Sequence, residues 1–164
     1  MRVLITGTTS GIGKAIALLF LKNGHEVIGM DILPSSIQHT KYTHLIKDIL
    51  RDELEDINDI DILINNAGVQ DSGNDIDINL KGTIRITEKY GVQQHIKSVL
   101  FIASASATSG AEFPEYAASK GGMISYMKNV ALRIAQYNAT SNSISPGGVT
   151  TELNRHVMED PILW

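Results

Sequence analysis

Tyr116 and Lys120 lie four residues apart in a stretch whose apolar residues recur at helical spacing, so both side chains would share one face of a helix. A free tyrosine has a pKa of about 10, which is too high for efficient base catalysis near neutral pH. An adjacent cation favours the phenolate and lowers that pKa, so the pair could exchange a proton with a hydroxyl or carbonyl compound. The same spacing also arises by chance as an exposed surface pair, and other features of the sequence must separate the two interpretations.

A glycine-rich turn, Gly7-Thr8-Thr9-Ser10-Gly11-Ile12-Gly13, joins a predicted strand to a predicted helix. The pyrophosphate of a dinucleotide needs a sharp turn, a close backbone and N–H groups that point at the anion, and glycines before a helix supply all three. The G-x-x-x-G-x-G spacing differs from the G-x-G-x-x-G Rossmann fingerprint, and a tight turn without a ligand is the alternative. The position at the first strand–helix junction favours a nucleotide site, with predicted contacts from Gly7, Thr9, Ser10, Gly11, Ile12 and Gly13.

Asp31 ends the second predicted strand, about 20 residues beyond the glycine turn. A carboxylate there can accept hydrogen bonds from the ribose hydroxyls of an adenosine and would repel a 2′-phosphate. An arginine or lysine at position 10 or 32 could bind such a phosphate, but these positions hold Ser10 and Ile32. We therefore expect NAD(H) to be preferred over NADP(H). A solvated loop aspartate and dual cofactor specificity are the alternatives.

Short apolar runs alternate along the chain with longer stretches of helical period. The short runs predict strands over 3–5, 27–30, 45–46, 60–64, 99–102 and 143–145, and the longer stretches predict helices near 12–22, 50–57, 75–90 and 115–137. Most of these strands are apolar throughout, which is typical of a sheet covered on both faces. The alternation predicts a doubly wound (Rossmann) α/β fold, a parallel sheet with helices on both faces, in a single domain over 1–164.

The composition excludes several classes of function. The 164 residues include no cysteine, which rules out disulfides, thiolate metal sites and cysteine nucleophiles, and we predict no metal site. A net charge of −4 provides no basic surface for nucleic acid. No apolar run approaches the roughly 18 residues of a transmembrane helix, and the first residues lack the apolar stretch of a signal peptide. We therefore expect a cytoplasmic protein with neither nucleic-acid nor membrane partners.

Three motifs follow one another in an order that is more specific than any of them alone: Thr6-Gly-x-x-x-Gly-Ile-Gly13, Asn65-Asn-Ala-Gly68 and Tyr116-x-x-x-Lys120. Together they resemble the short-chain dehydrogenase/reductase family, from the first residues to about residue 151. The resemblance implies hydride transfer between NAD(H) and a small-molecule carbonyl or secondary alcohol substrate. It assigns the general acid/base to Tyr116, and to Lys120 the lowering of the tyrosine pKa and a hydrogen bond to the nicotinamide ribose.

The resemblance implies roles for further residues. Ser104 would hydrogen-bond the substrate oxygen, with Ser106 as the less favoured candidate, and Asn79 would hold a water that links the lysine to solvent. Asp48 and Ile49 would contact the adenine. In Asn66-Ala67-Gly68 the small residues would let the backbone approach the cofactor, and the asparagine could brace the central sheet. The loop residues Pro146, Gly147, Val149 and Thr151 would contact the nicotinamide. The family also implies a homodimer or homotetramer that assembles through the helices around 75–90 and 116–137.

The sequence departs from the family pattern in two places. Only 10 residues separate Gly68 from Asn79, where family members have a longer helical excursion, and the chain stops at Trp164. We therefore expect the usual last strand to be missing, the sixth strand to lie at a sheet edge, and the substrate segment to be incomplete from about 152. Two other functions stay open: a catalytically silent NAD-binding sensor or structural protein, and a sugar-nucleotide epimerase or dehydratase, which uses a similar tyrosine–lysine pair.

Overall fold

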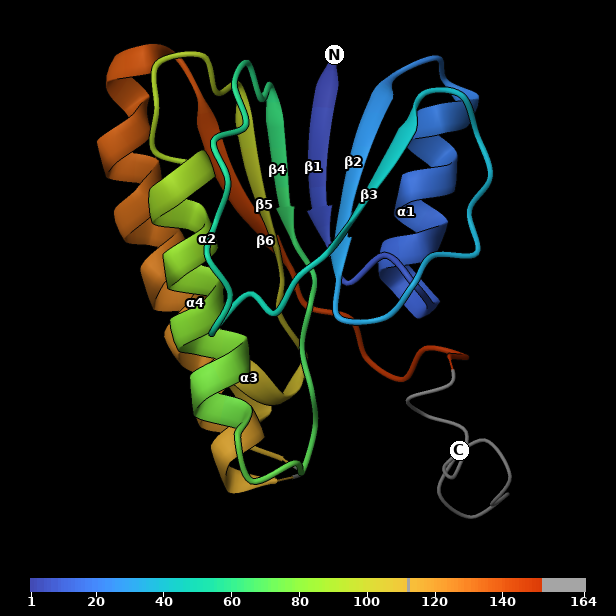
Figure 1. Cartoon of the computed structure of the whole chain (residues 1–164). Coiled ribbons are helices and arrows are strands. Elements are labelled where there is room, and N and C mark those ends of the chain that lie inside the picture. Colours follow the sequence, from blue (N-terminus) through green and yellow to red (C-terminus); the bar gives the residue numbers. More distant parts are fainter. Residues whose placement is uncertain (112, 152–164) are drawn as a thin grey trace.

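The computed structural model describes residues 1–111 and 113–151, which form one parallel sheet with helices packed against it (Figure 1). The strands are β1 (Arg2–Thr6), β2 (Glu26–Asp31), β3 (Tyr42–Ile46), β4 (Ile62–Asn65), β5 (Ser98–Ile102) and β6 (Thr140–Ile144). The helices are α1 (Gly11–Lys22), the π-helix η1 (Ile76–Gly82), α2 (Thr83–Tyr90), α3 (Ser106–Ser109), α4 (Pro114–Ile134) and the 3-10 helix η2 (Ala135–Tyr137).

The six strands lie in the order β3-β2-β1-β4-β5-β6, and each neighbouring pair is parallel. The chain therefore builds outward from β1 in one direction, returns to pair β4 with β1, and builds outward in the other. Such a reversal leaves a crevice at the carboxyl ends of the central strands, where ligands bind in folds of this type. The predicted doubly wound fold is confirmed, and β6 lies at the edge of the sheet formed by the described residues, as expected.

Two apolar layers cover the sheet, because successive side chains of each strand point to opposite faces. One layer joins residues such as Leu4 and Phe101 to Met123, Val130 and Ile134 of α4, and α2 packs on the same side. The other layer joins alternate strand residues to Ala17 and Leu21 of α1, on the opposite side of the sheet. The near-continuous apolar character of the strands follows from this double coverage.

The predicted helix near 50–57 is wrong: these residues form a turn and an irregular segment. The carboxylate of Asp48 accepts a hydrogen bond from the Leu50 N–H at 2.8 Å, which offers the backbone an alternative to a helix. The guanidinium of Arg85 donates to the Ile49 carbonyl at 3.0 Å, and the Tyr90 hydroxyl donates to the Glu55 carbonyl at 2.7 Å. Side chains of α2 thus take carbonyl groups that a helix would have used internally.

Other boundaries differ from the prediction in smaller ways. The helix predicted over 75–90 begins as the π-helix η1, β3 extends over 42–46, and β4 begins at 62 rather than 60. The sixth strand begins at Thr140 and ends at Ile144, so Ser145 lies outside it, and the short helix α3 was not predicted. The predicted substrate segment from 152 onward lies outside the described residues.

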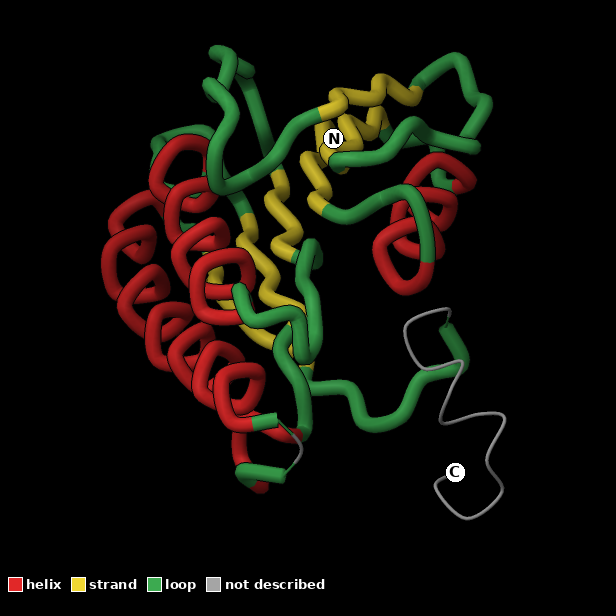
Figure 2. The backbone as a smooth tube through the Cα atoms, turned by 60° about the horizontal axis from the view of Figure 1, so that its bottom comes forward, coloured by secondary structure: helices red, strands yellow, loops and turns green. Residues whose placement is uncertain are grey.

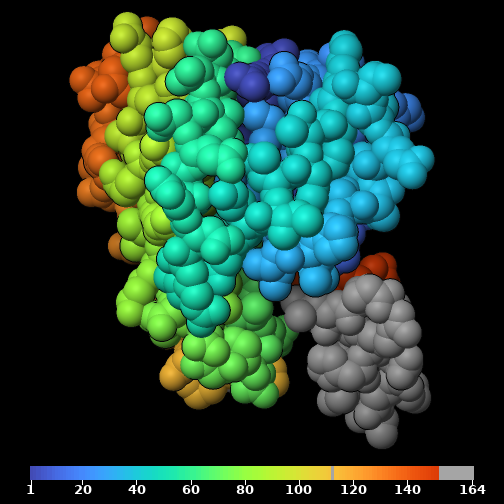
Figure 3. Space-filling model, viewed as in Figure 1, coloured from blue at the N-terminus to red at the C-terminus, as the bar shows by residue number. Residues whose placement is uncertain are grey.

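The connections on either side of β3 contain no helix within residues 32–41 and 47–61 (Figure 2). The space-filling view shows the connection from β3 to β4, in teal, lying over one face of the molecule (Figure 3). Among the described residues, no helix combines the length and apolarity needed to span a bilayer.

Candidate active site

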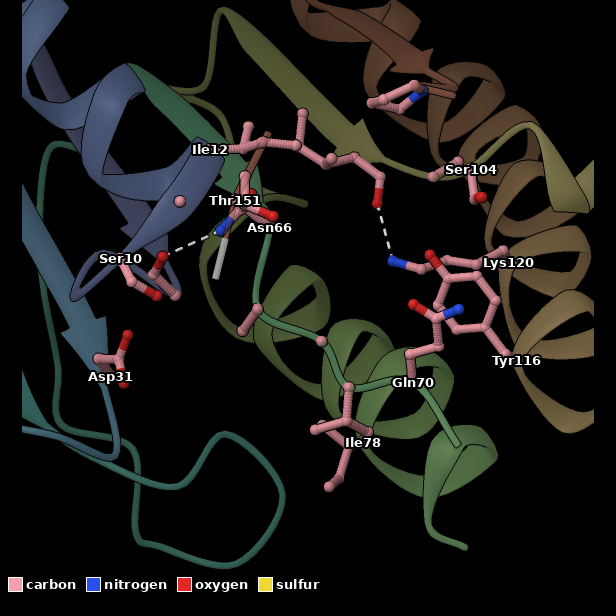
Figure 4. Close-up of a pocket in the computed structure, with 18 of the residues that line it drawn as sticks. Ser10, Ile12, Asp31, Asn66, Gln70, Ile78, Ser104, Tyr116, Lys120 and Thr151 are labelled. Atoms are coloured by element: carbon pink, nitrogen blue, oxygen red, sulfur yellow. Dashed lines mark hydrogen bonds between the residues drawn. The ribbon is translucent and has the colours of Figure 1, made fainter. Parts of the chain in front are cut away.

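A cleft of about 1160 Å³ opens at the carboxyl ends of the central strands, at the point where the strand order reverses. Ligand pockets in proteins typically have volumes of roughly 300–1,000 Å³, so this cleft has room for a dinucleotide-sized ligand. The close-up shows Asp31 and Ser10 toward one end and Ser104, Tyr116 and Lys120 toward the other (Figure 4).

The structure brings most of the predicted site residues together around this cleft. The predicted residues that line it are Gly7, Ser10, Gly11, Ile12, Asp31, Asp48, Ile49, Asn66, Ala67, Gly68, Ser104, Tyr116, Lys120, Pro146, Gly147, Val149 and Thr151. Thr9, Gly13 and Asn79 do not line it. Each of these three lies directly behind a lining residue and supports it, as the following contacts show.

The glycine turn is shaped by close backbone contacts. Gly7 has a φ of +74°, a left-handed conformation that side chains disfavour, and a Cβ there would lie 2.8 Å from the Ala67 Cα. A Cβ at Gly13 would overlap the Gly7 carbonyl, so Gly13 lets α1 pack against the turn. Gly11 faces the Thr151 side chain, which places the loop after β6 across the start of α1.

Asn66 braces the turn from the neighbouring strand. Its side-chain Nδ2 donates to the carbonyls of Thr6 and Gly7, at 3.0 Å each. The Thr6 hydroxyl accepts hydrogen bonds from the N–H groups of Asn66 and Ala67, also at 3.0 Å each. Asn66 and Ala67 therefore hold the glycine turn in place. The side-chain NH2 of Asn66 donates to protein carbonyls rather than to a ligand.

The carboxylate of Asp31 is held at the mouth of the cleft. One oxygen accepts the Thr9 N–H at 3.0 Å, and the other accepts the Leu33 N–H at 3.1 Å. Each carboxylate oxygen has a second lone pair, so both can still accept hydrogen bonds from a ligand. Thr9 thus acts on the site through Asp31.

Lys120 is 4% exposed, and its ammonium donates to the Ile102 carbonyl at 3.0 Å. The ammonium nitrogen lies 5.7 Å from the centre of the Tyr116 ring, so the predicted pair is brought together on α4. Burial lowers the pKa of Lys120 to about 8, while the negative charge of Asp75 acts in the opposite direction. A buried lysine with a lowered pKa in a cleft is typical of a functional site.

Ser104 and Ser106 occupy different positions. Both are buried, but only Ser104 lines the cleft. The Ser104 hydroxyl donates to the Ser106 Oγ at 3.1 Å and accepts the Ser106 N–H at 3.2 Å. This geometry orients the Ser104 oxygen, and the choice of Ser104 over Ser106 stays a prediction.

Asn79 is fully buried in the π-helix η1, a helix type that is frequent at functional sites. Its side chain accepts the Val69 N–H at 2.8 Å and donates to the Val69 carbonyl at 2.9 Å and to the Ser119 Oγ at 3.1 Å. The side chain therefore clamps the segment after the second motif and contacts the residue next to Lys120.

The cleft also contains residues that the sequence did not single out. They are Met30, Ile32, Leu33, Lys47, Arg51, Val69, Gln70, Ile78, Ile102, Ala103, Ala105, Phe113 and Gly148. Most of them neighbour a predicted residue along the chain, which is the one signal that could have found them. Lys47 and Arg51 follow β3, away from positions 10 and 32, where the sequence pattern would place a basic group for a 2′-phosphate. Among the described residues, no group of acidic or histidine side chains could hold a metal ion.

Comparison with known proteins identifies relatives across the whole chain. A family model described as short chain dehydrogenase matches residues 1–162. The chain is 32% identical over 190 residues to the short chain dehydrogenase adrF of Penicillium rubens, covering 99% of this chain and 74% of that protein. It is 30% identical over 189 residues to the 3-oxoacyl-[acyl-carrier-protein] reductase FabG of Thermotoga maritima, covering 95% and 77%.

Solved structures of dehydrogenases also match this chain. A 4-hydroxyisoleucine dehydrogenase complexed with NADH matches with a TM-score of 0.88 at 26% identity, covering 99% of this chain and 79% of that one. An aldohexose dehydrogenase of Thermoplasma acidophilum matches with a TM-score of 0.82 at 26% identity, covering 99% and 74%. Since the family model spans nearly the whole chain and the ordered motifs meet in one cleft, the chain belongs to the short chain dehydrogenase family.

Proposed function

We propose that this protein is an oxidoreductase that transfers a hydride reversibly between NAD(H) and a carbonyl or secondary alcohol substrate. The observation that carries the proposal is the convergence of Ser104, Tyr116 and Lys120 at one end of a cleft whose other end holds the glycine turn and Asp31. Relatives named as dehydrogenases and reductases, one of them complexed with NADH, support the same reaction type.

The residues divide the work of the reaction between them. The nicotinamide ring of the cofactor supplies or accepts the hydride at the substrate carbon. In the reductive direction the Tyr116 hydroxyl donates its proton to the substrate oxygen, and in the oxidative direction its phenolate accepts the proton of the alcohol. The Lys120 ammonium lies close enough to favour the phenolate. The Ser104 hydroxyl, which donates to Ser106 in this structure, turns to donate a hydrogen bond to the substrate oxygen when substrate binds. Asn79 supports this arrangement through its hydrogen bonds to Val69 and to Ser119, the residue next to Lys120.

We propose that NAD(H) is preferred over NADP(H). The Asp31 carboxylate faces the cleft, where a 2′-phosphate would meet its negative charge. Two basic residues also line the cleft, but both are paired with acids: the Lys47 ammonium lies 3.0 Å from Glu55, and the Arg51 guanidinium lies 3.3 Å from Asp48. A 2′-phosphate would have to compete with these carboxylates for the basic groups.

The first experiment is a calorimetric titration of the protein with NADH and NADPH, followed by a screen of ketones and alcohols. We expect tighter binding of NADH than of NADPH, and turnover of at least one carbonyl compound. Binding of neither nucleotide would reject the proposed function, and tighter binding of NADPH would reject the preference. NADH binding without turnover of any substrate would favour the alternative of a catalytically silent sensor.

Replacement of Tyr116 by phenylalanine tests the catalytic assignment. The variant lacks the hydroxyl that carries the proton, so we expect turnover to be lost while the Kd for NADH changes by less than about twofold. Tyr137→Phe, in η2, is the matched control because it removes a tyrosine hydroxyl outside the cleft. Retained turnover in Tyr116→Phe would refute the role of Tyr116.

Two further properties stay predictions. A homodimer or homotetramer rests on the family, and a cytoplasmic location rests on the sequence. The large exposed apolar residue of α4 is Leu132, with 81% of its surface accessible, and it is the position on this helix best suited to an apolar contact between subunits.

A further inference from the structure

A ring of hydrogen bonds links three segments at the Asp31 end of the cleft. The Thr8 hydroxyl lies 2.9 Å from the Tyr42 hydroxyl, which lies 2.8 Å from Nδ1 of His44. Nε2 of His44 lies 2.8 Å from the Leu33 carbonyl. The Thr9 hydroxyl donates to the same carbonyl at 3.3 Å, and because Thr8 and Thr9 are adjacent, the ring closes on the glycine turn.

The direction of these hydrogen bonds follows from the one group that can only accept. A backbone carbonyl has no proton, so Nε2 of His44 must donate to Leu33. In a neutral imidazole Nδ1 is then an acceptor, and the Tyr42 hydroxyl donates to it. The Thr8 hydroxyl in turn donates to the Tyr42 oxygen. Both hydroxyls and both ring nitrogens are therefore assigned as donors or acceptors in these hydrogen bonds.

The strand next to Tyr42 is shaped to admit this arrangement. Gly29 lies in the middle of β2, where glycine weakens a strand and often marks a close approach of other atoms. A Cβ at Gly29 would overlap the Tyr42 hydroxyl and the Thr8 Oγ1. Thr8 itself is fully buried. The hydrogen bond between Thr8 and Tyr42 thus occupies space that any other residue at position 29 would fill.

The ring acts on residues that face the cofactor site. Asp31, Ile32 and Leu33 all line the cleft, and Asp31 is bonded to the N–H groups of Thr9 and Leu33. The side chains of Ile32 and Leu33 are 66% and 56% exposed, so apolar burial holds this segment only weakly. The backbone of Asp31 is held by the pairing of β2 with β3, and its carbonyl accepts the Lys47 N–H at 2.8 Å. The hydrogen bonds from His44 and Thr9 to the Leu33 carbonyl fix Leu33, whose N–H donates to one oxygen of the Asp31 carboxylate.

We propose that Tyr42 and His44 are positioning residues that hold Leu33 in place and, through the Leu33 N–H, orient the Asp31 carboxylate for the adenosine half of the dinucleotide. This inference rests on the proposed function, because it assumes that the cleft binds a dinucleotide. Neither residue lines the cleft, so both act through the segment they hold. Loss of either should weaken binding of the adenosine half and leave the nicotinamide half and the chemistry unchanged.

The test uses Tyr42→Phe and His44→Phe, which keep a ring of similar size and remove the hydrogen bonds. Calorimetry would give the Kd for three ligands: NADH, ADP-ribose for the adenosine half, and reduced nicotinamide mononucleotide for the other half. We expect the Kd for NADH and for ADP-ribose to rise together, on the order of five- to tenfold, with the third Kd unchanged. The kcat at saturating NADH should also be unchanged.

A conservative variant and matched controls separate positioning from general damage. The side-chain amide of His44→Gln can still donate to the Leu33 carbonyl, so this variant should recover most of the affinity lost in His44→Phe. Tyr137→Phe and His95→Phe, at positions outside the cleft, should leave all three Kd values unchanged.

The outcomes distinguish the inference from the proposed function. Unchanged Kd values for NADH and ADP-ribose in both ring variants would overturn the inference while the function stands. An equal loss for all three ligands would overturn it in favour of a structural role. If the unaltered protein binds neither NADH nor ADP-ribose, the proposed function fails first and the inference with it.

Discussion

Lys120 illustrates how the fold changes the properties of a side chain. Lys120 is 4% exposed, and the loss of water around its ammonium lowers its pKa to about 8. The opposing influence comes from Asp75, a buried carboxylate that accepts hydrogen bonds from the N–H groups of Asp71 and Ser72 and from the Ser72 hydroxyl. The pKa of Lys120 thus depends in part on a residue outside the three motifs.

The lowered pKa of Lys120 predicts a pH dependence of stability. The unfolded lysine has a pKa of 10.5 and the folded one about 8, so between these values the unfolded chain binds more protons and stability rises with pH. Below about pH 8 the cost of the buried charge is fully present. We therefore expect the unfolding free energy of the cofactor-free wild type to approach that of Lys120→Met as pH rises from 8 to 10.5.

Urea unfolding at a series of pH values measures this difference. Lys128→Met, at an exposed position of α4, is the control for removing a lysine from the same helix. Burial raises the pKa of Tyr90 to about 12, which lowers stability above pH 10, but this contribution is common to both proteins and cancels. A difference between wild type and Lys120→Met that is constant from pH 8 to 10.5 would contradict the prediction.

Replacement of Asp75 by asparagine should shift the pH range over which stability rises with the deprotonation of Lys120. The variant loses the negative charge that raises the pKa of Lys120, so that pKa should fall further and the rise in stability should begin at a lower pH. Asp77→Asn is the matched control, because Asp77 lies in the π-helix η1 that begins directly after Asp75 and is paired with Lys81. An unchanged onset in Asp75→Asn would show that Asp75 has no influence on the lysine.

At the scale of elements, α4 carries two glycines directly after Lys120. A Cβ at Gly121 would meet only the Ala107 carbonyl at 3.6 Å, an ordinary contact, whereas a Cβ at Gly122 would lie 2.8 Å from the end of the Leu80 side chain. Glycine inside a helix costs about 0.5–1 kcal/mol relative to alanine. The two positions differ in packing and not in backbone conformation, since both lie within the 21 residues of α4.

We therefore expect Gly121→Ala to raise the unfolding free energy by about 0.5–1 kcal/mol. Gly122→Ala should gain less, because Leu80 has to move to admit the new methyl group. Chemical denaturation of both variants measures the two differences directly. Equal gains would show that the Leu80 side chain adapts without cost, and destabilisation by Gly121→Ala would contradict the packing described for α4.

At the scale of the whole molecule, the chain forms the sheet and its cleft within 164 residues. Its alignment with the adrF dehydrogenase extends over 190 residues, more than the 164 of the chain, so the chain is shorter than this relative within the matched region. The described structure has turns and loops on both sides of β3. The ten residues between Gly68 and Asn79 form a loop and the beginning of the π-helix η1. Side-chain hydrogen bonds from Arg85, Tyr90 and His44 hold the two connections on either side of β3, which contain no helix.

The exposed apolar residue of α4 allows a test of assembly. We expect the protein to sediment as a homodimer or homotetramer, and Leu132→Glu to shift it to a smaller species because it places a charge in an apolar contact. Leu19→Glu on α1, at a position 59% exposed, should leave the sedimentation unchanged. A monomeric wild-type protein would reject the predicted assembly, and an unaffected Leu132→Glu would place the contact elsewhere.

By itself, the sequence determined the fold class and marked the main candidate residues of the site, because local patterns encode both. Apolar runs, the glycine turn at Gly7 and the spacing of Tyr116 and Lys120 each involve only a few neighbouring residues. The tertiary structure alone decided the rest, because it depends on contacts between distant segments. Arg85 and Tyr90 bond to carbonyl groups of residues 49–55, which form no helix. The side-chain amide of Asn79 is hydrogen-bonded to Val69 and Ser119. The hydrogen bonds of Tyr42 and His44 link β3 to the glycine turn. No local pattern marks such partners, since hydrogen bonds between distant segments form only once the sheet has brought them side by side.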